Sequence, residues 1–369
     1  MHIFNISFHE LLRHDAFFAL ISSCLACIFL VLTKKWHRDL SVDTTDGVQK
    51  FHEMPTPRIG GVSIVIGVLA GYAASSHSPE ASAKREILAA ILLAGIPAFI
   101  FGLLEDLTKK ISVRARLLAT MASGVIGWGI TGFSISHVDI PGVDYILGFT
   151  FISVLFTAFA VGGVANSINI IDGFNGLSAG ASILMVGTLG LIARQVNDIP
   201  LAFACLIIAF AILGFLILNW PLGKIFLGDG GAYFVGFSIA WLAVLLPERN
   251  ADVSPWTSLL VCAYPIVEVG VSYIRKSLRE GYSPGQPDGV HLHMLLNKRV
   301  VRKIFPNLSL LQQNSLTSPL LWLLNVLPCA AALVFFRSFI LTISALIVFV
   351  LVYVIVYGRL VFFKWGLSK

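Results

Sequence analysis

Long apolar stretches separated by short polar segments make up most of the chain. Eleven stretches of about 17 to 20 mostly uncharged residues could each cross the ~30 Å hydrocarbon core of a membrane as a helix. They are residues 16–33, 59–76, 87–104, 117–133, 145–165, 177–193, 200–219, 232–247, 256–274, 319–336 and 338–358. The pattern predicts an all-α fold, a polytopic helical bundle with about eleven transmembrane helices and a single membrane domain over residues 1–369.

The few charged residues predict an orientation. Only 12% of the residues are charged and 57% are hydrophobic, whereas a soluble domain carries roughly 25% charge. If the N-terminus lies outside, twenty of the twenty-six Lys and Arg residues fall on the inside, as expected for a membrane protein. We therefore expect an outer N-terminus and an inner C-terminus. The net charge of +6 then reflects topology and gives no reason to expect a nucleic acid partner.

The longer polar segments all fall on the inner side of this topology. They are residues 34–58, 105–116, 166–176, 220–231 and 275–318. Polar clusters on one side favour an enzyme, because a transporter needs polar groups near the middle of the bilayer. The exception within an apolar stretch is Glu268, seven residues before Arg275. It is either an interfacial carboxylate tethered by that arginine or a residue that lines a site.

Two polar clusters follow the ends of predicted helices. Glu105 and Asp106 end the third apolar stretch and precede four cations, an arrangement that suits either a solvated boundary or a phosphate site. These cations are Lys109, Lys110, Arg114 and Arg116. In the second cluster, Asn166, Asn169 and Asp172 are spaced three apart and would share one helix face.

The second cluster runs on into the turn sequence "DGFNG", which ends that helix. Unpaired polar groups at a membrane boundary are costly, so the aligned trio favours a wet cavity. A hydrated loop cap explains Asn175 and Gly176 well but explains the aligned trio poorly.

A glycine-rich segment, "FLGDGGAYFVGF", leads into the eighth apolar stretch. Its glycines allow close approach of the backbone to a ligand, and the start of the next helix offers free N–H groups to an anion. Asp229 is a poor partner for a bare phosphate, but it suits a divalent cation held between carboxylate and phosphate oxygens. We therefore expect Mg²⁺ at Asp229, with Mn²⁺ as the other candidate.

A fourth cluster, "DGVHLHMLLNKR", contains His291 and His293 followed by Arg299 and further cations. Two histidines could form half of a zinc site, but no cysteine or third histidine is near in the sequence to complete it. Phosphate contact is the better interpretation. Carboxylates, cations and a glycine-rich turn together predict phosphoryl transfer between a soluble diphosphate and a membrane-anchored phosphate.

Five motifs carry a resemblance to a known family. "HEMPTPRIGG", "LEDL", "NSINIIDGFNGL", "FLGDGG" and "HLHMLL" occur in the order seen in the polyprenyl-phosphate N-acetylhexosamine-1-phosphate transferases, glycosyltransferase family 4. The resemblance covers roughly residues 50–300. It implies a bacterial inner-membrane enzyme with a cytoplasmic active site, which uses Mg²⁺ to convert a UDP-amino sugar and undecaprenyl phosphate into undecaprenyl-diphospho-sugar and UMP. Relatives in this family commonly form homodimers.

The resemblance also implies roles for single residues. Asp229 resembles the metal ligand, and Phe226 resembles the ring that packs on uracil. Asp172 and Asn169 match the motif that lines the nucleotide-sugar pocket, a wall to which Asn166 and Asn175 also belong. Glu105 and Asp106 correspond to the paired acids at the lipid phosphate, and His291 and His293 to the histidines near the diphosphate. Arg58 and Arg114 resemble phosphate-facing cations. Arg299 is a candidate substrate-binding residue from the fourth cluster itself.

Three positions depart from the family pattern: Glu105 replaces an aspartate, Asn175 replaces the second aspartate of "DGxDG", and Met294 replaces a final histidine. These changes favour a branch that acts on O-antigen or related glycan precursors over the peptidoglycan enzyme, phospho-N-acetylmuramoyl-pentapeptide transferase. The expected mechanism is direct attack of the lipid phosphate on the β-phosphorus, with Asp106 holding or deprotonating the acceptor. A covalent intermediate on Asp106 or Asp172 is the competing mechanism.

Two other functions fit the composition. A CDP-alcohol phosphatidyltransferase also works on membrane phosphates, but "DGFNGLSAG" lacks the spacing of its signature. A transporter of a nucleotide- or lipid-linked sugar would move intact substrate and release no UMP.

Overall fold

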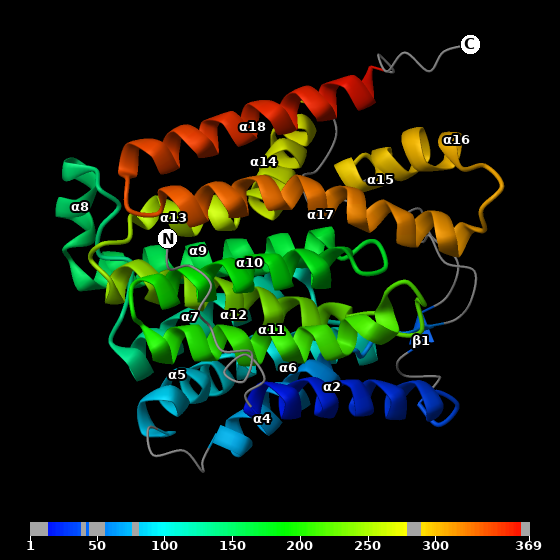
Figure 1. Ribbon diagram of the computed structural model, residues 1–369, viewed down its shortest axis with the longest axis horizontal. Coiled ribbons are helices and arrows are strands. Elements are labelled where there is room, and N and C mark those ends of the chain that lie inside the picture. Colours follow the sequence, from blue (N-terminus) through cyan, green and yellow to red (C-terminus); the bar gives the residue numbers. More distant parts are fainter. Residues whose placement is uncertain (1–13, 38–41, 44–55, 76–80, 279–288, 363–369) are drawn as a thin grey trace.

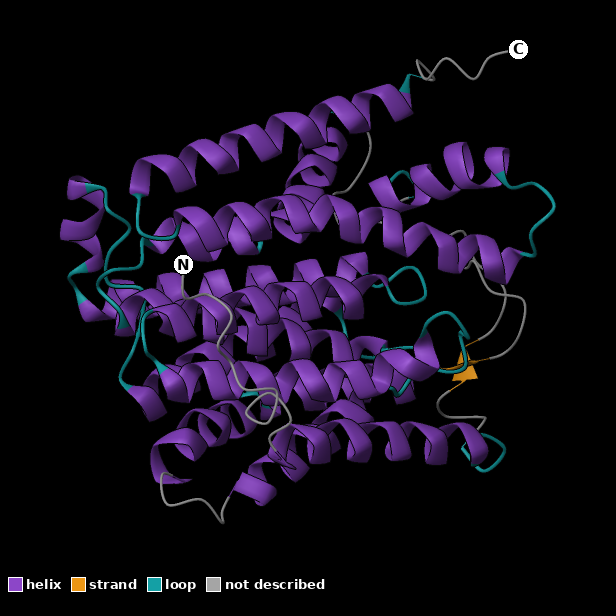
Figure 2. Ribbon diagram, viewed as in Figure 1, coloured by secondary structure: helices purple, strands orange, loops and turns teal. Residues whose placement is uncertain are grey.

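The computed structural model describes residues 14–37, 42–43, 56–75, 81–278 and 289–362 (Figure 1). Residues 52–55 of the first motif and parts of the predicted loops 34–58 and 275–318 lie outside the described residues. The described chain is almost entirely helical, with one short antiparallel strand pair, in which Val42–Asp43 (β1) faces Thr56–Pro57 (β2) (Figure 2).

The helices account for most of the described residues. In chain order they are α2 (His14–Leu32), α4 (Gly61–Ala74), α5 (Ala81–Ala94), α6 (Ile96–Thr108), α7 (Val113–Thr131), α8 (Pro141–Leu147), α9 (Thr150–Ile171), α10 (Leu177–Gln195), α11 (Ile199–Asn219), α12 (Gly228–Arg249), α13 (Pro255–Val261), α14 (Ala263–Ser277), α15 (Leu292–Leu296), a π-helical turn (Asn297–Val301), α16 (Arg302–Ile304), α17 (Leu310–Phe335) and α18 (Phe339–Val361).

Polar residues mark several helix starts. Ser112 accepts a hydrogen bond from the backbone of Ala115 at the start of α7, and Asp198 does the same for Leu201 in α11. Ser309 and Gln312 form a reciprocal capping box at the start of α17. These caps satisfy backbone N–H groups that have no partner within the helix.

Within the described residues, seven helices are long and apolar enough to span a membrane, or nine if each of two bent pairs counts as one span. The protein is therefore a multi-pass, all-α membrane protein. The expected count of eleven spans is not confirmed by the part of the chain that the structure describes. The stretch 59–76 forms α4, with only 14 helical residues, and α7 is not among the apolar spans. The stretches 87–104 and 256–274 are each broken, with bends of 44° and 73° between their halves.

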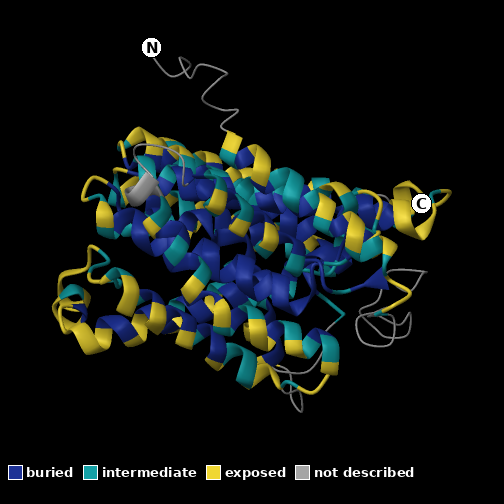
Figure 3. Ribbon diagram, turned by 90° about the horizontal axis from the view of Figure 1, so that it is seen from below, coloured by how far each residue is buried: buried dark blue, intermediate teal, exposed yellow. Residues whose placement is uncertain are grey.

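Helix α12 forms the centre of the bundle. Every residue from Gly228 to Pro247 is buried, and α4, α6, α7, α9, α10, α11 and α13 all pack on this helix. The buried residues run as a band through the middle of the molecule, with the exposed residues on the outer helices (Figure 3). The β1–β2 pair, the loop after α9 and the turn before α12 lie at one end of the bundle (Figure 1). The fold thus brings the predicted polar clusters to one end, next to the start of its most buried helix.

Candidate active site

The start of α12 is joined to the segment after β2 by backbone hydrogen bonds. The N–H of Phe226 donates to the Pro57 oxygen at 2.8 Å, and the N–H groups of Gly60 and Gly61 donate to the oxygens of Phe226 and Leu227, each at 2.9 Å. Gly228 has a φ of +74°, and a Cβ built there would lie 2.0 Å from the Arg58 carbonyl oxygen. Only glycine fits this junction, which places Arg58 beside Asp229.

Asp106, near the end of α6, holds the first turn of α12 through both carboxylate oxygens. Its Oδ1 accepts the N–H of Asp229 and its Oδ2 accepts the N–H of Gly230, each at 2.9 Å. The carboxylate is buried and lies at the positive end of the helix dipole, where a negative charge is stabilised. Asp106 therefore sets the position of the backbone that carries Asp229.

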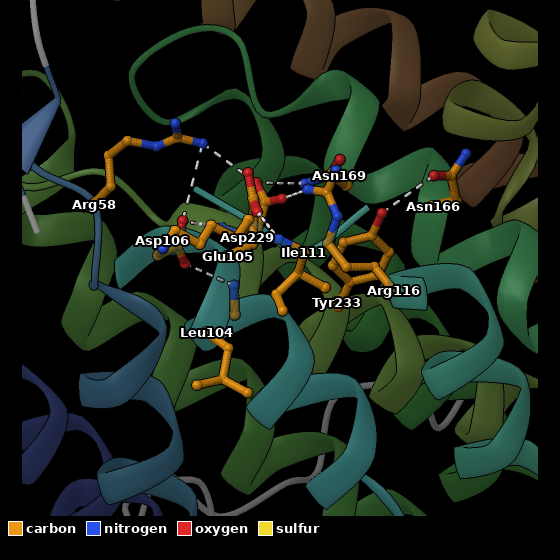
Figure 4. Close-up of polar contacts among 12 residues, drawn as sticks. Arg58, Leu104, Glu105, Asp106, Ile111, Arg116, Asn166, Asn169, Asp229 and Tyr233 are labelled. Atoms are coloured by element: carbon orange, nitrogen blue, oxygen red, sulfur yellow. Dashed lines mark hydrogen bonds and ion pairs between the residues drawn. The ribbon is translucent and has the colours of Figure 1, made fainter. Parts of the chain in front are cut away.

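The Asp229 carboxylate lies among three donors from different elements (Figure 4). Arg58 Nη2 and Asn169 Nδ2 each lie 3.2 Å from Oδ1, and Arg116 from α7 contacts Oδ2. Asp229 itself is 5% exposed. Two guanidinium groups thus converge on one buried carboxylate, and both would face a phosphate that entered beside it.

A second layer of contacts holds Arg116 and Asn166. The Arg116 guanidinium carbon lies 5.8 Å from the centre of the Tyr233 ring, close enough for a cation–π interaction. The Tyr233 hydroxyl donates to Asn166 Oδ1 at 3.3 Å. Asn166 and Asn169 therefore both belong to the Asp229 cluster, as their spacing predicted.

Asp172 ends α9 close to this cluster. Its Oδ1 accepts a hydrogen bond from the Ser178 hydroxyl at 2.5 Å. Loss of hydration raises the pKa of Asp172 to about 6, although the Ser178 bond and the Arg58 charge both act in the opposite direction. Asp172 and Asp106 interact electrostatically, so Asp106, Asp172 and Asp229 share one region at this end of the bundle.

The two predicted histidines occupy different environments. His293 is fully buried; its ring packs edge-on against Phe174 at 5.6 Å and stacks on His291 at 5.3 Å. Burial lowers the pKa of His293 to about 4, against the opposing charge of Glu268. His293 is therefore neutral at pH 7. His291 forms a hydrogen bond with Glu268, with 3.1 Å between Nδ1 of His291 and Oε1 of Glu268.

Several predicted site residues make structural contacts instead of joining the Asp229 cluster. Glu105 accepts the backbone N–H of Ile111 at 2.7 Å. Asn175 bonds to α17, accepting the Ser318 hydroxyl at 2.6 Å through its carbonyl oxygen. Arg299 donates to the carbonyl oxygens of Leu360 and Val361 at the end of α18. Phe226 is half-buried, and its backbone forms the junction with the β2 segment.

Arg114 is exposed, and the arginine that reaches Asp229 is Arg116. Two residues apart on a helix, these side chains point in nearly opposite directions. The sequence contains a signal for this choice, because Ala119, Thr120 and Ser123 follow Arg116 at three, four and seven positions and are all buried. The small residues mark the inward face of α7, and Arg116 lies on it.

The fold and the site together define a multi-pass membrane protein with a buried cluster of carboxylates and guanidinium groups at one end. Residues 88–247 match the profile of glycosyl transferase family 4. This match supports the family resemblance that the motifs carry.

Similar proteins carry related names. The chain is 28% identical over 277 residues to undecaprenyl-phosphate alpha-N-acetylglucosaminyl 1-phosphate transferase of Yersinia pestis, covering 73% of each chain. The protein of that name from Escherichia coli K12 is 28% identical over 281 residues, covering 73% of this chain and 72% of the relative. A probable undecaprenyl-phosphate N-acetylglucosaminyl 1-phosphate transferase of Bacillus subtilis is 28% identical over 246 residues, 66% of each chain.

Proposed function

We propose that this protein transfers an N-acetylhexosamine 1-phosphate from a UDP-sugar to undecaprenyl phosphate, giving undecaprenyl-diphospho-sugar and UMP. The names of the relatives support the acceptor and the reaction, and they do not favour a transporter or the peptidoglycan enzyme. The observation that carries the proposal is the Asp229 cluster, where Arg58 and Arg116 converge on a buried carboxylate. O-antigen or a related surface glycan is the proposed destination of the product.

The donor diphosphate binds beside Asp229 in this proposal. Arg58 and Arg116 then turn their N–H groups from the carboxylate to phosphate oxygens, which suit a guanidinium fork as well as a carboxylate does. Asn169 remains within hydrogen-bonding reach of the same position. The cluster is thus preorganised for an anion that carries more than one negative charge.

The lipid phosphate attacks the β-phosphorus directly. A new P–O bond forms to the β-phosphorus as its bond to the bridging oxygen breaks, and UMP leaves with that oxygen. A phosphate monoester has a second pKa near 6, so at pH 7 the acceptor already carries most of its negative charge. No protein base is required, which agrees with Asp106 using both oxygens on backbone N–H groups and disfavours Asp106 as a covalent nucleophile.

Magnesium fits the donor chemistry of the site. Asp229 could supply a carboxylate oxygen, and Mg²⁺ commonly binds one or two carboxylates together with substrate phosphates. Among the described residues, no group of three His, Cys, Asp or Glu side chains could hold a metal ion. Asp229 is the proposed ligand, and phosphate oxygens of the substrate would have to supply further ligands. When bound, the ion would neutralise charge on the diphosphate; Mn²⁺ could substitute.

The proposed setting is the bacterial inner membrane, with the N-terminus in the periplasm and the Asp229 cluster on the cytoplasmic face. This sidedness rests on the topology expected from the sequence, in which twenty of the twenty-six Lys and Arg residues fall inside. It places the site where a soluble UDP-sugar and a lipid headgroup can meet. A homodimer, common in the family, is the proposed assembly.

The test is release of UMP by purified protein supplied with Mg²⁺, undecaprenyl phosphate and a panel of UDP-amino sugars. Release with at least one sugar is expected, and it should depend on the lipid. Asp229→Asn should abolish turnover while its size-exclusion profile stays that of the wild type. Near-normal turnover in this variant would remove Asp229 as the metal ligand.

A further inference from the structure

Glu268 is the most deeply buried acidic side chain outside the Asp229 cluster in the part of the chain described, with 1% of its surface exposed. It lies in α14, after the 73° bend that separates this helix from α13. A buried carboxylate is costly unless hydrogen bonds compensate for its lost hydration. Its partners therefore indicate what it does.

Three donors surround the Glu268 carboxylate. Oε1 accepts the backbone N–H of Leu292 at 2.8 Å and lies 3.1 Å from His291 Nδ1. Oε2 accepts the Tyr353 hydroxyl from α18 at 2.7 Å. Arg275, the tether in one of the two interpretations of Glu268, donates from Nη2 to Ser272 at 3.3 Å. These donors stabilise the ionised carboxylate.

This arrangement selects one form of the His291 ring. An ionised carboxylate can only accept hydrogen bonds, so Nδ1 of His291 must carry the proton. If the ring is neutral, Nε2 then has a free lone pair and can accept a hydrogen bond. If the ring is protonated, Nε2 carries a proton as well and is a second donor. A carboxylate behind a histidine sets ring orientation and tautomer in the same way in hydrolytic triads and metal sites.

The segment that carries His291 is fixed to α18 at further points. The Tyr357 hydroxyl donates to the Val290 oxygen at 3.0 Å, and Arg299 donates to the Val361 oxygen at 2.7 Å. On its other side, His291 stacks on His293, whose ring contacts Phe174, two residues after Asp172. The contacts thus run without a break from α14 and α18 to the loop that holds Asp172.

We propose that Glu268 is a positioning residue for His291: it fixes the tautomer protonated at Nδ1 and so presents Nε2 to the substrate diphosphate. Tyr353 holds Glu268 in place, which makes the last helix, α18, a support for the active site. This inference rests on the proposed function for the identity of the substrate. The Glu268–His291 pair itself stands on geometry alone.

The experiment combines nitrogen NMR of histidine-labelled protein with the UMP-release assay. His291→Gln assigns the His291 signals. Glu268→Ala should remove the preference for Nδ1–H and lower kcat by about 10- to 100-fold, the usual range for the loss of such a supporting residue, with a much smaller change in KM. Glu268→Gln keeps a carbonyl oxygen for Nδ1–H and should retain the tautomer and recover part of the activity.

Glu248→Ala is the matched control. Glu248 also lies near a histidine, with 3.6 Å between its Oε1 and His137 Nδ1, and it also accepts the Ser136 hydroxyl. It lies at the opposite end of α12 from Asp229, so UMP release and the His291 signals should not change. A general effect of losing a carboxylate–histidine pair would appear in this variant too.

The outcomes separate the two proposals because the NMR measurement needs no substrate. An unchanged His291 tautomer in Glu268→Ala, with or without a fall in kcat, overturns the positioning role. If Glu268→Ala does not fold, Glu268→Gln must keep the Nδ1–H signal, and its loss counts against the role. A wild-type protein with the Nδ1–H signal but no UMP release contradicts the proposed function and leaves the pair established.

Discussion

Replacing Asp106 with asparagine separates two roles for this residue, a support for the start of α12 and a base for the acceptor. In the structure both oxygens accept backbone N–H groups, from Asp229 and Gly230 at 2.9 Å each. Asparagine keeps one carbonyl oxygen but turns an NH₂ group toward the other N–H. One hydrogen bond is then lost, and a buried donor faces another donor.

The size of the effect follows from these two bonds. A hydrogen bond to a charged group contributes about 1.5–3 kcal/mol, so Asp106→Asn should lower the free energy of unfolding by roughly that amount. For a chain of this length, we expect Tm to fall by about 2–6 °C. Because the same turn carries Asp229, UMP release should fall as well.

The assay is thermal unfolding of purified protein in detergent, followed by tryptophan fluorescence, with UMP release measured on the same samples. Glu105→Gln is the matched control, because Glu105 accepts only one backbone N–H, from Ile111 at 2.7 Å. The glutamine carbonyl can keep this bond, so Tm should change little. Asp106→Asn with the wild-type Tm but no turnover would refute the support role and favour a base.

Two further predictions concern charges in the site. Arg116→Gln should raise KM for the UDP-sugar about 10- to 100-fold, the equivalent of one lost hydrogen bond between charged groups. Arg114→Gln is the control, because Arg114 lies on the exposed side of α7, and its KM should stay close to that of the wild type. Equal effects of the two substitutions in steady-state kinetics would contradict the assignment of Arg116. The pKa of Asp172 is raised from 3.8 to about 6. Between pH 3.8 and about 6, the folded protein therefore binds more protons at Asp172 than the unfolded chain does. The stability that this group contributes falls as the pH rises through that window. Unfolding curves for Asp172→Asn should lack this fall, and an identical pH dependence in wild type and variant would exclude Asp172 as its source.

Hydrophobic pattern predicted the class of fold, but it could not predict where helices break. An apolar stretch looks the same whether its helix is continuous or bent, and residues 256–274 contain a 73° bend between α13 and α14. The central place of α12 was also not predictable. Its sequence is no more apolar than that of α18, yet α12 is buried throughout and α18 lies at the edge. Tertiary packing alone sets this difference.

The motifs contain Asp106, Asp172 and Asp229, and the fold brings these three residues to one end of the bundle. Choosing among neighbouring polar residues was harder. Asn175 and Arg299 resemble ligand-binding residues in sequence but hold α17 and α18, since a donor can bond to a carbonyl oxygen as well as to a phosphate. The role of Glu268 was hard to predict for a different reason: its partner Tyr353 lies 85 positions away in the sequence. Such pairings come only from the fold.

The central claim is that the cluster around Asp229 transfers a sugar phosphate to a membrane lipid. Its most direct test uses proteoliposomes that contain undecaprenyl phosphate in their membrane. A UDP-amino sugar labelled at the β-phosphate is added from outside. We expect the label to appear in the lipid as UMP is released in equal amount. Label recovered inside the vesicles as intact UDP-sugar, with no UMP and no labelled lipid, would contradict it.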